Sequence, residues 1–161
     1  MKVRRRRRRE NKTDYKLRFG LLKSTKPRFV IRKTNKYIII QLVETSEAQD
    51  KIKSGISSKE LLKNGWDIKF KGSLKSIPAA YLTGILMARK VGKGDFIIDM
   101  GMVRNLSGSR IYAAAKGLID GGLKIAVDES VFPSEEKILG KQLNKELQDM
   151  IKNLIAKIKN G

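Results

Sequence analysis

Six consecutive arginines, Arg4 to Arg9, constrain this chain more than any other feature of its sequence. Adjacent guanidinium groups repel one another and carry almost no apolar surface, so the run cannot enter a hydrophobic core. Residues 1–36 hold 16 Lys and Arg residues against 2 acids, and therefore contribute +14 of the formal net charge of +20. The sequence predicts a basic arm over residues 1–26, which needs a polyanionic partner to become ordered, and a globular domain behind it.

The residues after the arginine run favour nucleic acid as the polyanion. Arginine binds phosphate oxygens in pairs and stays charged at any working pH. Asn11, Thr13 and Tyr15 add groups that hydrogen-bond sugars or stack on bases, which a simple counter-ion would not need. The alternatives for such a run are a nuclear-type targeting signal and a solvated tail.

Apolar runs and turn residues predict an α/β domain over residues 27–127. A hairpin of strands 28–33 and 36–44 is expected, because Pro27 suits a strand start and Thr34-Asn35 suits a turn. Its β-branched run is typical of a strand covered on both faces. Other expected elements are strands 48–57, 95–102 and 123–127, and helices 58–63, 79–91 and 111–120. This order indicates a three-layer fold, a mixed β-sheet with an antiparallel hairpin and helices on both faces.

Three segments outside this regular pattern also carry expectations. Residues 19–26 are interpreted as a connector whose Phe19, Leu21 and Leu22 dock on the domain. Trp66 is expected to pack against the edge of the sheet rather than to stack on a base. Residues 128–161 are predicted to form a C-terminal helical appendage. One continuous helix over residues 134–159 is expected, with its apolar stripe docked on the domain and Lys141, Lys145, Lys152 and Lys159 on the opposite side.

The sequence lacks the residues that common catalytic and metal sites need. It contains no Cys and no His, the usual ligands and general base. Glu44, Asp95 and Asp99 on predicted strands are isolated, whereas two-metal phosphodiester cleavage needs several converging carboxylates. No apolar run approaches the length of a membrane span. We therefore expect no catalytic residue, cofactor, metal, small-molecule substrate or membrane partner, and a degenerate nuclease is the remaining catalytic alternative.

Candidate RNA-binding residues lie in the arm, in the first hairpin and at the start of the helix over 111–120. Around Ser109, backbone N–H groups either bind a phosphate or merely begin that helix. The full set is Arg4, Arg5, Arg6, Arg7, Arg8, Arg9, Asn11, Lys12, Thr13, Tyr15, Lys16, Arg18, Arg28, Arg32, Lys33, Asn35, Lys36, Lys71, Ser109 and Arg110.

Several strings carry a family resemblance. They are Asn11-Lys12-Thr13-Asp14-Tyr15, Pro27 to Lys36, Ser57 to Leu61, Pro78-Ala79-Ala80-Tyr81-Leu82-Thr83-Gly84 and Gly108-Ser109-Arg110 with Lys116-Gly117. With the arginine-rich start, they closely resemble large ribosomal subunit protein eighteen in its archaeal and eukaryotic branch, and the length resembles the archaeal members. Ser76-Ile77 stands where members tend to have Asn.

The resemblance implies a ribonuclease-H-like fold without catalytic acids and a structural role in the large ribosomal subunit, in the cytoplasm. Such a protein binds 5S rRNA and anchors it in the central protuberance against 23S rRNA and neighbouring ribosomal proteins. A general, chromatin-like nucleic-acid-binding protein is the competing class. Preference for 5S rRNA over tRNA of similar charge separates the two.

Overall fold

The computed structural model of this protein describes residues 3–47 and 49–160, with side chains as far as Ile158. The α-helices are α1 (Arg6–Arg9), α2 (Tyr15–Lys23), α3 (Ile77–Val91), α4 (Arg110–Asp120), α5 (Glu135–Ile138) and α6 (Lys145–Asn160). The strands are β1 (Arg28–Lys33), β2 (Ile38–Ser46), β3 (Gln49–Ser57), β4 (Asp95–Asp99) and β5 (Lys124–Ile125). Short 3-10 helices, η1 (Ser58–Asn64), η2 (Ile68–Ser73) and η3 (Glu129–Val131), lie in the connections.

The five strands form one mixed sheet in the order β3-β2-β1-β4-β5. The hairpin β1–β2 is antiparallel, with Arg28 opposite Val43 and Lys33 opposite Ile38. The pair β1–β4 is parallel, and so is β4–β5, because α3 and α4 return the chain to the same end of the sheet. The predicted mixed sheet with an antiparallel hairpin is confirmed.

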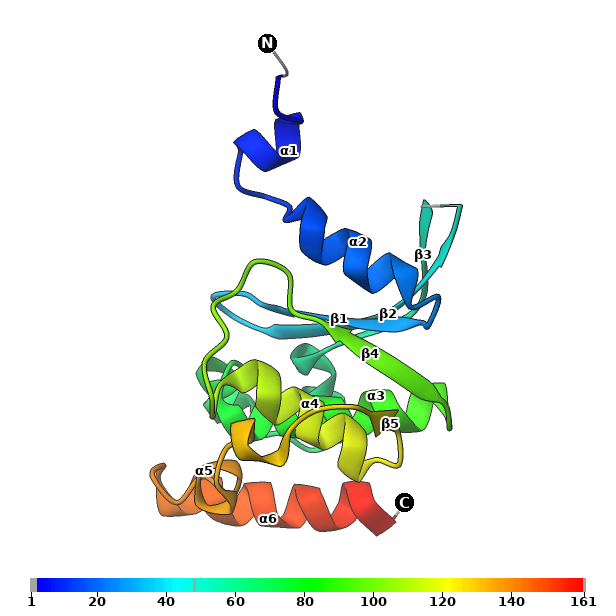
Figure 1. Cartoon of the computed structure of the whole chain (residues 1–161). Coiled ribbons are helices and arrows are strands. Elements are labelled where there is room, and N and C mark those ends of the chain that lie inside the picture. Colours follow the sequence, from blue (N-terminus) through cyan, green and yellow to red (C-terminus); the bar gives the residue numbers. More distant parts are fainter. Residues whose placement is uncertain (1–2, 48, 161) are drawn as a thin grey trace.

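Helices cover both faces of this sheet, as the β-branched hairpin predicted. On one face, Phe29 and Ile31 of β1 are fully buried in the core, against which α3 and α4 pack. Figure 1 shows α3 and α4 below the sheet and α2 of the arm above it. Helix α3 is buried nearly all round, as its apolar composition predicted, so it forms the centre of the fold.

The string Pro78 to Gly84, which carried much of the resemblance, lies in α3 and allows this helix to pack closely against α4. A Cβ on Gly84 would lie 2.3 Å from the carbonyl oxygen of Ala114, and one on Gly117 would lie 2.1 Å from that of Tyr81. The helices α3 and α4 therefore touch backbone to backbone at these two glycines. Beside them, the hydroxyl of Tyr81 donates a 2.7 Å hydrogen bond to Asp120.

Ser76 is the N-cap of α3. Its hydroxyl oxygen accepts a hydrogen bond from the N–H of Ala79 at 3.4 Å. Serine is among the best N-cap residues, so this contact stabilises the start of the helix. Trp66 is 2% exposed in the hydrophobic core, and its indole N–H donates to the carbonyl of Phe70. Its burial confirms that it packs inside the protein rather than presenting its ring to a base.

Several element boundaries differ from the prediction. Residues 19–23 of the predicted connector belong to α2, and only residues 24–26 connect it to β1. The helix begins after Asp14, because that carboxylate accepts hydrogen bonds from the N–H groups of Lys16 and Leu17. Leu21 and Leu22 are half-buried, but Phe19 does not dock and is 62% exposed. The strand predicted over 95–102 ends at Asp99, and β5 has only two residues. The third strand is confirmed from Gln49 onward, and Ala48 lies outside the described residues.

The predicted single C-terminal helix is wrong, but its docking on the domain is confirmed. Gly140 at φ +71° turns the chain between α5 and α6, a conformation that breaks a helix. The apolar stripe nevertheless continues into α6, where Leu147, Ile151, Leu154 and Ile158 are at most 5% exposed and join the core. Lys141, Lys145 and Lys152 are exposed as expected, and the side chain of Lys159 lies outside the described part.

Replacing Leu147 with aspartate should destabilise the free protein. The carboxylate would be buried against the core without a partner, so we expect a loss of about 3 kcal/mol in the free energy of unfolding. Circular dichroism during thermal unfolding measures this effect. Asn153→Asp introduces the same group on the exposed side of α6 and should change little. An unchanged melting temperature for Leu147→Asp would contradict the docking of α6.

Candidate nucleic-acid interface

The arginine run is ordered locally and presents its charges to solvent. All six residues from Arg4 to Arg9 are exposed. The Nε–H of Arg7 donates to the hydroxyl of Thr13 at 2.9 Å, and Glu10 pairs with Arg6 at 3.4 Å and with Lys12 at 2.9 Å. Short-range contacts therefore fold the arm back on itself and leave most of its guanidinium groups exposed for other partners.

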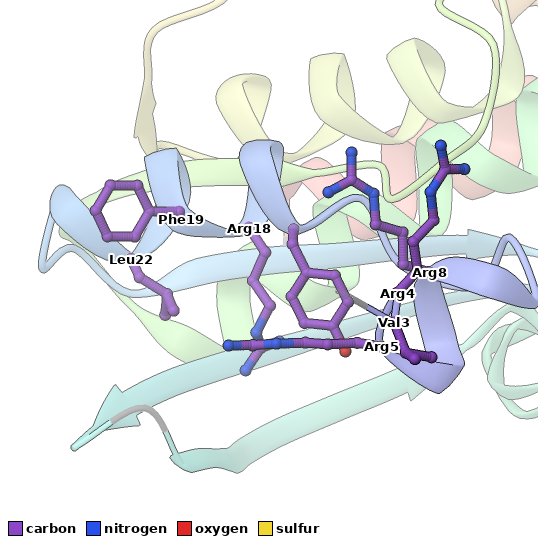
Figure 2. A pocket seen from close by; sticks show the side chains of 8 residues that line it. Val3, Arg4, Arg5, Arg8, Arg18, Phe19 and Leu22 are labelled. Carbon is purple, nitrogen blue, oxygen red and sulfur yellow. The ribbon is translucent and has the colours of Figure 1, made fainter. Parts of the chain in front are cut away.

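A hollow of about 630 Å³ lies between the start of the arm and α2; we call it the arm hollow. Its lining includes the aromatic and aliphatic side chains of Tyr15, Phe19 and Leu22, and arginines surround them. Figure 2 shows Phe19 and Leu22 at one end, Arg4 and Arg8 at the other, and Arg5 extending between them. The guanidinium carbon of Arg5 lies 5.0 Å from the centroid of the Tyr15 ring, a cation–π contact.

The helix α2 is also tied to the sheet through one carboxylate. Asp50 of β3 accepts from Arg18 of α2 at 3.0 Å and from Arg28 of β1 at 2.7 Å, and the Thr45 hydroxyl donates to it at 2.9 Å. Burial opposes ionisation of Asp50, but the hydrogen bonds from Arg28, Arg18 and Thr45 outweigh it and hold its pKa below the usual value. This network fixes the orientation of α2 over the sheet.

Arg28 therefore occupies a structural position, although it was a candidate RNA-binding residue. It is 3% exposed, and it contacts Asp50, Thr45 and, at 3.5 Å, Asp99. Arg32 is less confined, because its guanidinium group is half-exposed while it donates to the carbonyl and carboxylate of Asp99 at 2.9 and 3.3 Å. Arg32 also lines a second hollow together with Lys12 and Thr13 of the arm, so the arm lies beside the hairpin.

A second basic group, the hairpin-tip cluster, surrounds the turn between β1 and β2. It comprises Lys33, Asn35, Lys36, Lys75, Arg104 and Arg110. Lys33, Asn35, Lys75 and Arg110 line one small hollow, and Lys33, Arg104, Ser109 and Arg110 line the next. The guanidinium of Arg110 donates to the carbonyl of Lys75 at 3.1 Å, which joins the start of α4 to the segment before α3.

The structure thus gathers most of the candidate residues into two basic groups, the arm with Arg32 and the hairpin-tip cluster, which together we call the basic surface. The first two hollows share Arg18, and the two hollows at the hairpin tip share Lys33 and Arg110. Arg32, which lines the second hollow, precedes Lys33 in β1, so the two groups adjoin at the end of this strand. Asn11, Lys12 and Lys16 are exposed along the arm. Ser109 is the N-cap of α4, where its side chain makes no capping hydrogen bond. Lys71 is exposed on η2 and lines none of these hollows.

Three residues of this surface were missed from the sequence. Lys75 and Arg104 each precede the start of a long helix, and positive charges at such positions were a usable signal. Phe19 was assigned to the domain because an apolar residue in a connector usually packs. No feature of the sequence alone showed that α2 would turn it outward.

The comparisons with known proteins agree with one another. A profile of the family described as "Ribosomal large subunit proteins 60S L5, and 50S L18" matches residues 1–94, more than half of the chain. The chain belongs to this family. It is 42% identical over 155 residues to a protein named large ribosomal subunit protein uL18 from Methanoregula boonei, which covers 92% of this chain and 87% of that protein.

Two further relatives bear the same name. The uL18 protein of Korarchaeum cryptofilum is 45% identical over 145 residues, with 88% of this chain and 72% of that protein covered. The uL18 protein of Methanoculleus marisnigri is 41% identical over 156 residues, with 95% and 87% covered. The resemblance inferred from the sequence strings is confirmed, and these relatives are archaeal.

Membership of the L5/L18 ribosomal family settles the class of function. The chain is a structural, non-enzymatic protein of the large ribosomal subunit, which is part of the cytoplasmic ribosome. Its partners are ribosomal RNA and neighbouring ribosomal proteins. The carboxylates weighed for catalysis are engaged elsewhere, since Glu44 pairs with Lys53 at 3.0 Å and Asp99 with the two hairpin arginines.

Two further observations concern metal-binding groups and membrane-spanning helices. Among the residues that the structure describes, no group of three or more acidic side chains gathers in a way that could hold a metal ion. Within the same described ranges, no helix has the length and apolar character needed to cross a membrane.

Proposed function

We propose that this protein binds 5S rRNA and anchors it in the central protuberance of the large subunit, against 23S rRNA and neighbouring proteins. The observation that carries the proposal is the basic surface made of two groups, the arm with Arg32 and the hairpin-tip cluster, which adjoin at the end of β1. Exposed arginines supply affinity for crowded phosphates, whereas a rigid hairpin and α4 fix the position of further charges. A flexible basic tail alone would bind any RNA equally.

Each of three segments of the chain has its own role in this proposal. Residues 1–26 form the basic RNA-binding arm, residues 27–127 the RNA-binding domain, and residues 128–161 a C-terminal segment on the far side. The exposure of the arm and the distance of α6 from the arm in Figure 1 support this division. Arg28 and, in part, Arg32 form ion pairs with Asp50 and Asp99. In this proposal they orient the RNA-binding groups rather than contact RNA themselves.

The specificity of the hairpin-tip cluster can be measured with a pair of lysines. Lys33 and Lys36 are exposed, and neither forms an ion pair among the described residues. We expect the double variant Lys33→Ala/Lys36→Ala to lose about 10-fold in affinity for 5S rRNA and at most about threefold for tRNA, because a positioned contact matters most on the RNA it fits. Fluorescence anisotropy with both labelled RNAs at fixed salt gives the two values.

A matched variant controls for the loss of charge itself. Lys145→Ala/Lys152→Ala removes the same charge from exposed positions of α6, far from the arm, and should leave 5S rRNA binding unchanged. Equal losses on both RNAs for the hairpin variant would instead support the general nucleic-acid-binding class.

A further inference from the structure

We propose that the arm hollow binds a single unpaired nucleotide of RNA, with its base stacked on Phe19 and its phosphate held by arginines of the arm. The inference rests on the proposed function, since it names the part of the RNA that one section of the basic surface receives. In this proposal the arm hollow receives a base as well as a phosphate, whereas the rest of the arm contacts phosphates. Phosphate contacts alone need no cavity and no aromatic wall.

The aromatic wall is the first observation. Phe19 is 62% exposed on α2, a large apolar surface on a helix that also carries Lys16, Arg18 and Lys23. Leu22, one turn further along α2, is half-buried and lines the same hollow. The Lys23 ammonium group lies 4.8 Å from the centroid of the Phe19 ring, but Lys23 lines a neighbouring hollow and leaves this one open. An exposed aromatic ring is the platform on which an unpaired base stacks.

The charge of the rim is the second observation. Arg4, Arg5 and Arg8 line the hollow and are exposed, and no acidic residue lies in its lining among the described residues. Arg18, which also lines it, is already paired with Asp50. The free guanidinium groups therefore come from the arm and the apolar wall from α2. The flat apolar ring suits the base of a nucleotide, and the planar guanidinium groups suit its phosphate.

The shape of the hollow selects an unpaired base. Its volume of about 630 Å³ lies in the range of pockets that enclose a small ligand. A base inside a double helix has both faces covered by its neighbours and cannot reach the ring of Phe19. A bulged or looped base has a free face, so the arm hollow should distinguish bulged RNA from continuous duplex.

A pair of stem-loop RNAs tests the inference with the full-length protein. The two RNAs are identical except that one carries a single bulged 2-aminopurine in its stem. We expect the wild type to prefer the bulged RNA by roughly 5- to 100-fold, which is the range of one base-stacking contact. Stacking should also quench the fluorescence of the bulged 2-aminopurine.

Three variants separate stacking from other effects. Phe19→Ala should lose both the preference and the quenching, with the binding of the continuous stem and the salt dependence unchanged. Phe19→Trp should retain both, since a larger ring stacks at least as well. Ile68→Ala removes a residue that is 76% exposed on η2 and should behave like the wild type.

The inference is overturned if Phe19→Ala binds both stem-loops as the wild type does, or if it loses equally on both. It is also overturned if a glutamate-rich decapeptide displaces the bulged RNA as well as a single-stranded RNA decamer does, because the hollow would then be a general anion or peptide site. Preference for 5S rRNA over tRNA is measured separately. If that preference persists without any bulge preference, the inference fails while the proposed function stands.

Discussion

Gly84→Ala should strongly destabilise the protein, although it replaces a helical glycine with the best helix former. The added Cβ would lie 2.3 Å from the carbonyl oxygen of Ala114 and 3.0 Å from Cα of Gly117. Both obstacles are backbone, so α3 and α4 must move apart. We expect a loss of at least about 3 kcal/mol in the free energy of unfolding, which outweighs the gain of up to about 1 kcal/mol from helix propensity.

Gly20→Ala is the matched control for this experiment. Gly20 also lies within a helix, but a Cβ there would meet nothing within 4 Å. The control should therefore be neutral or slightly stabilising. Chemical denaturation followed by circular dichroism compares the two variants. A midpoint for Gly84→Ala equal to that of the wild type would show that the two helices do not touch through their backbones.

The second large effect concerns the arginine run. Replacing Arg4 to Arg9 with glutamine should reduce affinity for 5S rRNA by about 10³-fold at 0.1 M salt and make the salt dependence much shallower. Each phosphate contact contributes about 0.7–0.9 to the slope of log K against log salt, so six contacts correspond to a change of about 4–5. Binding isotherms at several salt concentrations give both numbers.

The control for this variant removes charge from the other end of the protein. Lys137, Lys145, Lys152 and Lys157 are exposed on α5 and α6, and their replacement with glutamine should leave the slope unchanged. If the arginine variant keeps the slope of the wild type, the run does not contact 5S rRNA phosphates and belongs to another partner.

The strands of the hairpin and the helix α3 could be predicted because their sequence patterns are local. The β-branched apolar run of the hairpin β1–β2 and the nearly uniform apolar composition of α3 each indicate one kind of element. The helix α2 was missed because charged residues and Gly20 weaken its apolar face, although Asp14 was a usable capping signal. The break at Gly140 was missed because Leu139, Leu143 and Leu147 continue the spacing of a helix across it.

The candidate site was predictable in its composition but not in all of its contacts. The exposed charges of the arm and of Lys33 and Lys36 follow from the sequence, because residues 1–36 hold only two acids against 16 Lys and Arg residues. The role of Arg28 did not, since its partners Asp50 and Asp99 come from β3 and β4, far along the chain. A charge in a strand was therefore interpreted as a surface group, when tertiary pairing buries it.

Because the arm lies outside the globular body, we expect different parts of the protein to set the association rate and the dissociation rate of RNA. Figure 1 shows α1 projecting beyond α2, at the opposite end of the molecule from α6. Exposed arginines at this extremity attract a polyanion before any other surface can touch it, over a screening length of about 8 Å at physiological salt. We therefore expect the run to raise the rate of encounter, and the arm hollow and the hairpin-tip cluster, which need an exact fit, to control the rate of release.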